Sequence, residues 1–264
     1  MGGESVTRTA PDGGGTDPGD GPARGATGRG PAGGRTGQVL SGLAVGLGLV
    51  MFLGAFAWGA VVYRPYTVPT SSMSPTIGVG DRVLAERVDG ADVRRGDVVV
   101  FKDAGWADAP VLKRVVAVGG DTVACCTDGR LTVNGRPIEE PYLPADEPAG
   151  ADDFPTVTVP EGRIFLLGDE RHGSLDSTAH LTDAASGTVA RGAVTARVDA
   201  VVWPMDGMLE RPSGFEDMGA LSAPGPLRTI TVLVVAGAVL VLGGAAYGPV
   251  AKRVGARREA GRVG

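Results

Sequence analysis

Residues 111–121 read VLKRVVAVGGD, a run of β-branched residues that ends in a Gly-Gly-Asp turn. This composition predicts a β-strand, and period-two alternation places Lys113 on the same face as Val115 and Ala117. Gly, Pro or Asp-Gly separates it from similar runs, which are YTVPT, DRVLAERV, GDVVVF, DTVACC, RLTVNG, RIFLLGD and ARVDAVVWP. No long stretch between them has a helical period. The sequence therefore predicts a mostly β domain built from antiparallel sheet.

Two uncharged apolar runs flank this domain, at residues 39–63 and 229–247. Each is long enough to cross a hydrocarbon core of about 30 Å as a helix rising about 1.5 Å per residue. The first run is too long and too far from the start of the chain for a cleaved secretory signal. We therefore predict two transmembrane helices, and the Gly42-x-x-x-Gly46 pattern in the first is a motif for helix packing.

The segments outside the two runs predict the orientation. Residues 1–38 are rich in Gly and Pro and contain no aromatic residue, which is typical of a disordered segment. Residues 248–264 form a basic tail, and Arg24, Arg29 and Arg35 precede the first run. Because Lys and Arg concentrate on the cytoplasmic side of spans, we expect a two-pass protein of the cell membrane with both termini cytoplasmic. Residues 64–228 then form an extracytoplasmic domain.

The composition also bears on ligands. The formal net charge is −5, and acidic residues outnumber basic ones between the two runs, so no nucleic-acid partner is expected. Cys125 and Cys126 are adjacent, without another Cys or a nearby His to complete a metal site. A vicinal disulfide and two free thiols are both open.

Residues 139–159, rich in Pro, Asp, Glu and Ala, predict a surface excursion or a small β insertion with long loops.

A serine-rich segment, PTSSMSPTI at residues 69–77, begins shortly after the first run. By itself the Ser-x-x-Pro sequence predicts a turn. The short chain from Tyr63 keeps Ser72 within about 30 Å of the membrane surface.

Lys113 interrupts an apolar strand. An ordinary lysine, with a pKa near 10.4, is almost wholly protonated at pH 7, and burial can lower that pKa by about 3 to 5 units. A buried Lys113 can thus act as a base toward a serine hydroxyl. The alternative is an edge-strand lysine whose ammonium group reaches water.

Together these elements resemble the signal peptidase I family, over nearly all of residues 66–204. Their order after a membrane span is part of the resemblance. The matching boxes are PTSSMSPT (69–76), GDRVL (80–84), RGDVVVF (95–101), KRVVAVGGD (113–121) and GDERHGSLDS (168–177).

The resemblance implies a membrane-bound serine endopeptidase that removes signal peptides from exported preproteins, cleaving after small residues at Ala-x-Ala-type sites. It implies a Ser-Lys dyad, with Ser72 as nucleophile and Lys113 as general base. The Ser72 N–H and the Thr70 hydroxyl would form the oxyanion hole. No metal or organic cofactor is implied.

Four further residues of the last two boxes receive supporting roles from the resemblance. Ser174 would hydrogen-bond and orient Lys113, and Asp176 would pair with Arg114. Gly168, which lacks a Cβ, would let the chain pass close to the lysine.

The last box also departs from the family pattern. Glu170 and Gly173 stand where Asn is common, and Thr178 where Arg is common. A carboxylate at Glu170 would favour the ammonium form of Lys113. His172 and His180 lie near several Asp residues, but the family has no histidine at the nucleophile, so both are expected to be loop residues.

Substrate contacts can also be predicted. We expect shallow apolar pockets for Ala-like side chains, formed by Tyr66, Val68, Ile77, Val111 and Leu112. An extended substrate would add as a strand beside residues 67–70. The expected partners are secretory preproteins and the lipid bilayer, and the protein is expected to be a monomer in the membrane.

The sequence suggests two alternatives to this function. One is a catalytically silent membrane scaffold or binding protein with the same fold, which the altered last box favours. The other is a relative of the Ser-Lys self-cleaving repressors, which would need a DNA-binding helical domain and a soluble chain, and the sequence has neither.

Overall fold

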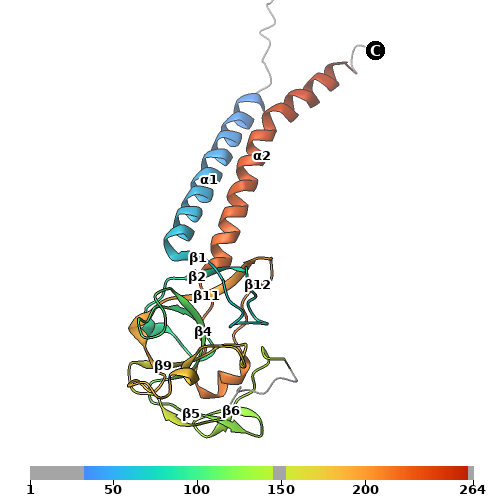
Figure 1. Ribbon diagram of the computed structural model, residues 1–264. Coiled ribbons are helices and arrows are strands. Elements are labelled where there is room, and N and C mark those ends of the chain that lie inside the picture. The colour runs from blue at the N-terminus through green and yellow to red at the C-terminus, as the bar shows by residue number, and fades with distance from the viewer. Residues whose placement is uncertain (1–32, 145–152, 261–264) are drawn as a thin grey trace, which may run out of the picture.

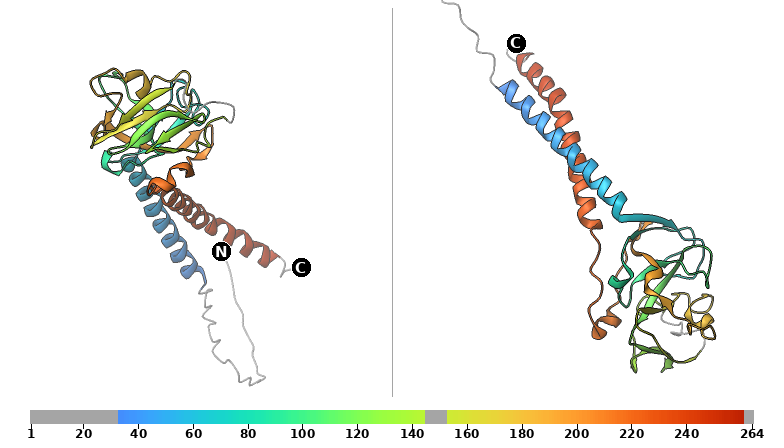
Figure 2. Two further views of the ribbon diagram at one scale, coloured as in Figure 1. Left: turned by 90° about the horizontal axis from the view of Figure 1, so that it is seen from below. Right: turned by 90° about the vertical axis from the view of Figure 1, so that its left-hand side faces the viewer.

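The computed structural model describes residues 33–144 and 153–260, which form a β domain and two long helices (Figure 1). Helix α1 spans Gly33–Val62 and helix α2 spans Leu227–Ala260. Both contain stretches that are long and apolar enough to cross a membrane, at Gly37–Val62 and Leu227–Tyr247. In Figures 1 and 2 they leave the β domain on the same side.

The helices extend beyond the predicted spans. Residues 33–38, predicted to be disordered, are helical, and so is the basic tail as far as Ala260. The rest of the predicted disordered segment, residues 1–32, lies outside the described residues, as do residues 261–264.

The mostly β prediction is confirmed, because every predicted run overlaps a strand and all strand pairs are antiparallel. The larger sheet has the order β1-β2-β11-β3-β4-β9-β10, with β12 paired to β11, and the smaller has the order β7-β6-β5-β8. The strands of the larger sheet are β1 (Tyr63–Thr67), β2 (Arg82–Glu86), β3 (Val98–Phe101), β4 (Val111–Val118), β9 (Arg163–Leu167), β10 (Val189–Ala190), β11 (Val194–Trp203) and β12 (Gly207–Met208). Those of the smaller are β5 (Thr122–Thr127), β6 (Arg130–Val133), β7 (Arg136–Pro137) and β8 (Phe154–Thr158).

Strand β4 carries Lys113 through the centre of the larger sheet, between β3 and β9. Residues 112–117 are all buried, so both faces of the strand are covered. The predicted alternation was wrong beyond Val115. The pairing of β4 with β9 is irregular between Val115 and Ala117, and these two residues pack in different apolar clusters. A β-bulge of this kind changes the face on which the following side chains lie.

The two helices pack through small residues. A Cβ at Gly237 would lie 2.7 Å from the carbonyl oxygen of Gly48, and Ser41 donates a hydrogen bond to the carbonyl oxygen of Gly244 at 2.7 Å. Gly42 and Gly46, which the sequence pattern favoured, have no neighbouring atom within 4 Å of such a Cβ. The helix contact is therefore made by Gly48 and not by the Gly-x-x-x-Gly pair.

Both helices are tied to the β domain. Helix α1 runs directly into β1, where the Tyr63 hydroxyl donates to Asp199 Oδ2 at 2.8 Å. The chain before α2 forms the 3₁₀ helix η4 (Ser213–Met218), whose Phe215 is buried in the apolar cluster shared by both sheets. Cys125 and Cys126 on β5 form a disulfide, which decides between the two states that the sequence left open.

Candidate active site

Ser72 lies in a tight turn between β1 and β2. The turn is closed by hydrogen bonds from Ser74 N to the Ser71 carbonyl and from Ile77 N to the Met73 carbonyl, both 2.8 Å. Met73 and Ile77 are completely buried beneath it. Because these two side chains anchor the turn in the core, the half-buried Ser72 hydroxyl is held at a fixed place on the surface of the domain.

Lys113 reaches Ser72 from β4, which β11 and β3 separate from β2 in the larger sheet. Its Nζ lies 2.8 Å from Ser72 Oγ, and the side chain is 3% exposed. Burial lowers the Lys113 pKa to about 8, although the carboxylates of Asp176 and Asp169 act in the opposite direction. A neutral amine is therefore accessible near neutral pH, in hydrogen-bond contact with a hydroxyl. Glu170, which we expected to raise this pKa, is not among the groups that do so.

The Thr70 hydroxyl lies beside the Ser72 hydroxyl, with 3.4 Å between their oxygens. On the other side, the carbonyl oxygen of Ser72 accepts a hydrogen bond from the backbone N–H of Glu170 at 3.2 Å. This bond joins the nucleophile turn to the segment that follows β9.

Arg114 was expected to pair with Asp176, but in the structure it pairs with Asp169. Its Nε and Nη2 donate to the two carboxylate oxygens of Asp169 at 2.8 and 2.6 Å, and Nη1 donates to the Gly96 carbonyl. The guanidinium lies 3.8 Å from the centre of the Tyr142 ring. Asp176 instead accepts hydrogen bonds from Gly168 N and from the Thr178 N–H and hydroxyl.

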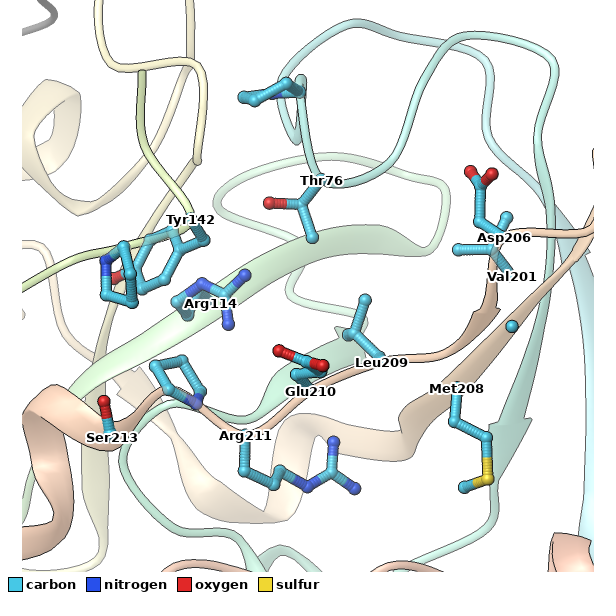
Figure 3. Close-up of a pocket in the computed structure, with 14 residues that line it drawn as sticks. Thr76, Arg114, Tyr142, Val201, Asp206, Met208, Leu209, Glu210, Arg211 and Ser213 are labelled. Atoms are coloured by element: carbon cyan, nitrogen blue, oxygen red, sulfur yellow. The ribbon is translucent and has the colours of Figure 1, made fainter. Parts of the chain in front are cut away.

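Figure 3 shows the pocket beside Arg114, which has a volume of about 540 Å³. Arg114 and Tyr142 lie at one end, and the Thr76 hydroxyl, buried and without a hydrogen-bond partner in the described part of the chain, lies above them (Figure 3). Neither Ser72 nor Lys113 lines this pocket, so it is separate from the candidate active site.

Gly168 is required by close approach. A Cβ there would overlap the Ser174 hydroxyl oxygen and lie 2.5 Å from the Ser72 carbonyl oxygen. We had predicted that Gly168 lets the chain pass close to Lys113. The atoms that a Cβ would meet first belong instead to Ser174 and to the nucleophile turn. Ser174 Oγ is buried but makes no hydrogen bond to any residue in 33–144 or 153–260. The expected bond from Ser174 to Lys113 is therefore absent.

Two of the departures in the last box, Glu170 and Gly173, compensate each other. A side chain at Gly173 would collide with the carboxylate of Glu170, so the small residue makes room for the longer one. Thr178, where the family has Arg, caps the Asp176 carboxylate with its N–H and hydroxyl. Arg171, which the sequence did not single out, pairs with buried Glu140 at 2.6 Å and donates to the Gly168 carbonyl.

A cleft of about 710 Å³ contains Ser72 and Lys113. Four of the five predicted pocket residues line it: Tyr66, Val68, Val111 and Leu112. Ile77 does not, because its side chain is completely buried in the apolar cluster beneath the nucleophile turn. At another part of the cleft lie Trp106 and His180, which the sequence did not associate with substrate.

The two histidines differ. His172 is exposed in a turn, whereas His180 ends a 3₁₀ helix (Ser177–His180), stacks on Trp106 and hydrogen-bonds Asp183 through Nδ1 at 2.7 Å. The described hydrogen bonds of the Ser72 hydroxyl involve Lys113 and Thr70, and neither histidine takes part. The geometry therefore favours a serine and lysine pair over a Ser-His-Asp arrangement.

Comparison with known proteins gives matches across the β domain. The family model for "Signal peptidase, peptidase S26" matches residues 42–203. Signal peptidase I of Mycobacterium tuberculosis is 34% identical over 216 residues, covering 63% of this chain and 71% of the relative. Signal peptidase I of Bacillus licheniformis is 35% identical over 127 residues, covering 45% and 67% respectively. A solved signal peptidase I from Enterococcus faecalis is 28% identical, covers 44% of this chain and 96% of its own, and has a TM-score of 0.32.

Proposed function

The chain belongs to the signal peptidase S26 family and is a hydrolase that removes signal peptides, and from this premise we propose that it does so with a Ser72-Lys113 dyad. The observation that carries the proposal is the 2.8 Å contact between Lys113 Nζ and Ser72 Oγ, made by a lysine that is 3% exposed. Burial lowers the pKa of this amine, so its neutral form is available at the nucleophile.

The proposed reaction has two stages. The neutral Lys113 amine takes the proton of the Ser72 hydroxyl as Oγ attacks the scissile carbonyl carbon. The tetrahedral intermediate then collapses, and the Lys113 ammonium gives its proton to the departing amine of the mature protein. In the second stage Lys113 removes a proton from water as that water attacks the carbonyl carbon of the acyl-serine ester. The bond to Ser72 Oγ then breaks, Lys113 returns the proton to Oγ, and the signal peptide leaves with a free carboxyl group while the hydroxyl and the neutral amine are restored.

The oxyanion of the intermediate would be bound by the Ser72 N–H and the Thr70 hydroxyl. The 3.4 Å separation of the Thr70 and Ser72 oxygens puts the Thr70 hydroxyl next to the atom that forms the new bond. A donor of this kind is typically worth about 3 to 4 kcal/mol of transition-state stabilisation.

Substrate would bind in extended form beside β1. That strand ends the larger sheet, so one of its edges has no strand partner in the described chain. A peptide that pairs with this edge beyond Thr67 would enter the cleft past Val68, Val111 and Leu112. These apolar side chains favour small residues next to the scissile bond, in an Ala-x-Ala-type junction.

The membrane arrangement belongs to the same proposal. Both helices would cross the bilayer, with both termini in the cytoplasm and residues 64–228 outside as a monomer. Because β1 follows α1 directly, the cleft is held close to the bilayer, where a signal peptide spans it.

Cleavage of a preprotein with an Ala-x-Ala junction tests the dyad. Detergent-solubilised Ser72→Ala and Lys113→Ala are each expected to lose activity by about 10³-fold or more, with folding and membrane insertion intact. His172→Ala, a matched control in an exposed turn, should retain wild-type activity. Activity that survives Lys113→Ala would exclude Lys113 as the base, and folded wild type without activity would point to the silent scaffold.

A further inference from the structure

Trp106 and His180 form one wall of the cleft that contains Ser72 and Lys113. Their rings are stacked, with centroids 4.5 Å apart and planes 16° from parallel. Trp106 comes from the loop between β3 and β4. His180 is the last residue of the 3₁₀ helix Ser177–His180, which begins where the 168–177 box ends. We call this pair the aromatic wall.

The aromatic wall is fixed from behind on both sides. The edge of the completely buried Phe101 packs against Trp106, with ring centroids 5.2 Å apart at an interplanar angle of 83°. Asp103 closes the loop by accepting from the N–H groups of Trp106 and Ala107 through its carbonyl. Asp183 holds the His180 ring at Nδ1. A rigid aromatic surface loses little entropy when a ligand side chain packs on it.

The wall lies at a distance from the dyad along the cleft. Lys113, Val111 and Ala109 line the cleft in succession as the chain runs back from β4 toward Trp106. Trp106 comes before the bend at Asp108 and Ala109, which separates it from the strand that carries Lys113. We expect a substrate whose Ala-x-Ala junction lies at the dyad to meet the wall with a side chain upstream of that junction.

The chemistry around the wall is apolar. Ala107 and Ala179, the chain neighbours of Trp106 and His180, line the cleft together with Pro110 and the 76% exposed Leu175. Small side chains here leave room for a large ligand group, in contrast to the branched and aromatic side chains around Val68 and Val111.

We propose that the aromatic wall is a second specificity site, which selects substrates with a large aliphatic or aromatic side chain at the fourth or fifth position before the cleaved bond, upstream of the Ala-x-Ala junction. The proposal rests on the proposed function, because it presumes that signal peptides bind in this cleft. Trp106 makes the contact, and His180 is a positioning residue that holds the Trp106 ring.

The test uses peptides with one constant Ala-x-Ala junction and Leu, Phe or Ser at the fourth or the fifth position before the bond. For wild type we expect kcat/KM to be about 5- to 20-fold higher for Leu or Phe than for Ser at the responsive position. Trp106→Ala should reduce this ratio to about 2-fold or less, Trp106→Phe should retain most of it, and His180→Ala should give an intermediate ratio. The ratio between substrates does not depend on the fraction of enzyme that is folded.

Two exposed residues outside the cleft provide matched controls. Trp203→Ala and His172→Ala remove the same side-chain types and should leave the ratio at the wild-type value. Two results would contradict the aromatic wall as a specificity site without affecting the dyad. One is a wild-type enzyme that cleaves the Leu, Phe and Ser peptides equally, and the other is a Trp106→Ala enzyme that keeps the wild-type ratio. Failure of wild type to cleave any of the peptides would instead refute the proposed function, and the wall with it.

Discussion

The pKa of Lys113 decides how activity depends on pH. Burial lowers this pKa to about 8, so the neutral amine increases as the pH rises through that value. We expect kcat/KM to increase about tenfold per pH unit below the pKa and to level off above it. Peptide cleavage from pH 6 to 10 measures this limb. Activity that is constant between pH 6 and 9 would contradict a titrating lysine base.

The same desolvation means that the charged form of Lys113 destabilises the folded state. A pKa near 8 in the folded protein, against 10.5 for an ordinary lysine, means that the folded state binds fewer protons than the unfolded state between these pH values. Stability therefore rises with pH across this interval, and the full penalty is present below about pH 8.

Replacement of this lysine by an apolar residue should remove the penalty. We expect Lys113→Met to be inactive but more stable than wild type by on the order of 1 to 3 kcal/mol at pH 7, after loss of the hydrogen bond to Ser72. Thermal unfolding of both proteins at pH 7 and pH 10.5 measures the difference, which should shrink at the higher pH. A difference that does not change with pH would mean that Lys113 is not desolvated as its burial indicates.

At the residue scale, the sequence predicted which side chains meet but not all their partners. Ser72 and Lys113 lie together as their boxes implied, whereas Arg114 pairs with Asp169 in place of Asp176. The register explains this: Arg114 is opposite Leu167, so the residues just after β9 reach its guanidinium. Only a three-dimensional strand register distinguishes two aspartates in one motif.

At the element scale, the strong strands were predictable because β-branched runs bounded by Gly and Pro leave few alternatives. The short strands β7, β10 and β12 were not, since two residues carry no periodic signal. The aromatic wall was also missed. Trp106 and His180 come from loops far apart in the sequence, and only tertiary packing brings them together.

The two helices were predicted from the sequence, but the residues at their contact were not. A Cβ at Gly237 would lie 2.7 Å from both the Gly48 carbonyl oxygen and the Phe52 nitrogen. These are backbone atoms, so α1 and α2 would have to separate. We expect Gly237→Ala to destabilise the helix pair by about 1 to 3 kcal/mol.

The matched control for this change is Gly46→Ala, at a glycine with no atom within 4 Å of the added Cβ. The melting temperature in detergent should fall for Gly237→Ala and stay at the wild-type value for Gly46→Ala. Equal melting temperatures for the two variants would show that the helices do not depend on this contact.

At the scale of the whole molecule, the geometry of the helices constrains the topology independently of charge. Because α1 and α2 leave the β domain on the same side, their far ends would lie on the same side of a membrane that both helices cross (Figures 1 and 2). Arg35, Lys252 and Arg253 near those ends favour the cytoplasmic side. In spheroplasts, a C-terminal tag should resist added protease, and a cleavage site inserted in the exposed Asp128-Gly129 turn should be cut. Digestion of the tag before permeabilisation would show the opposite orientation, with the C-terminus outside the cell. Survival of both sites would place the β domain inside the cell, where it would not meet exported preproteins.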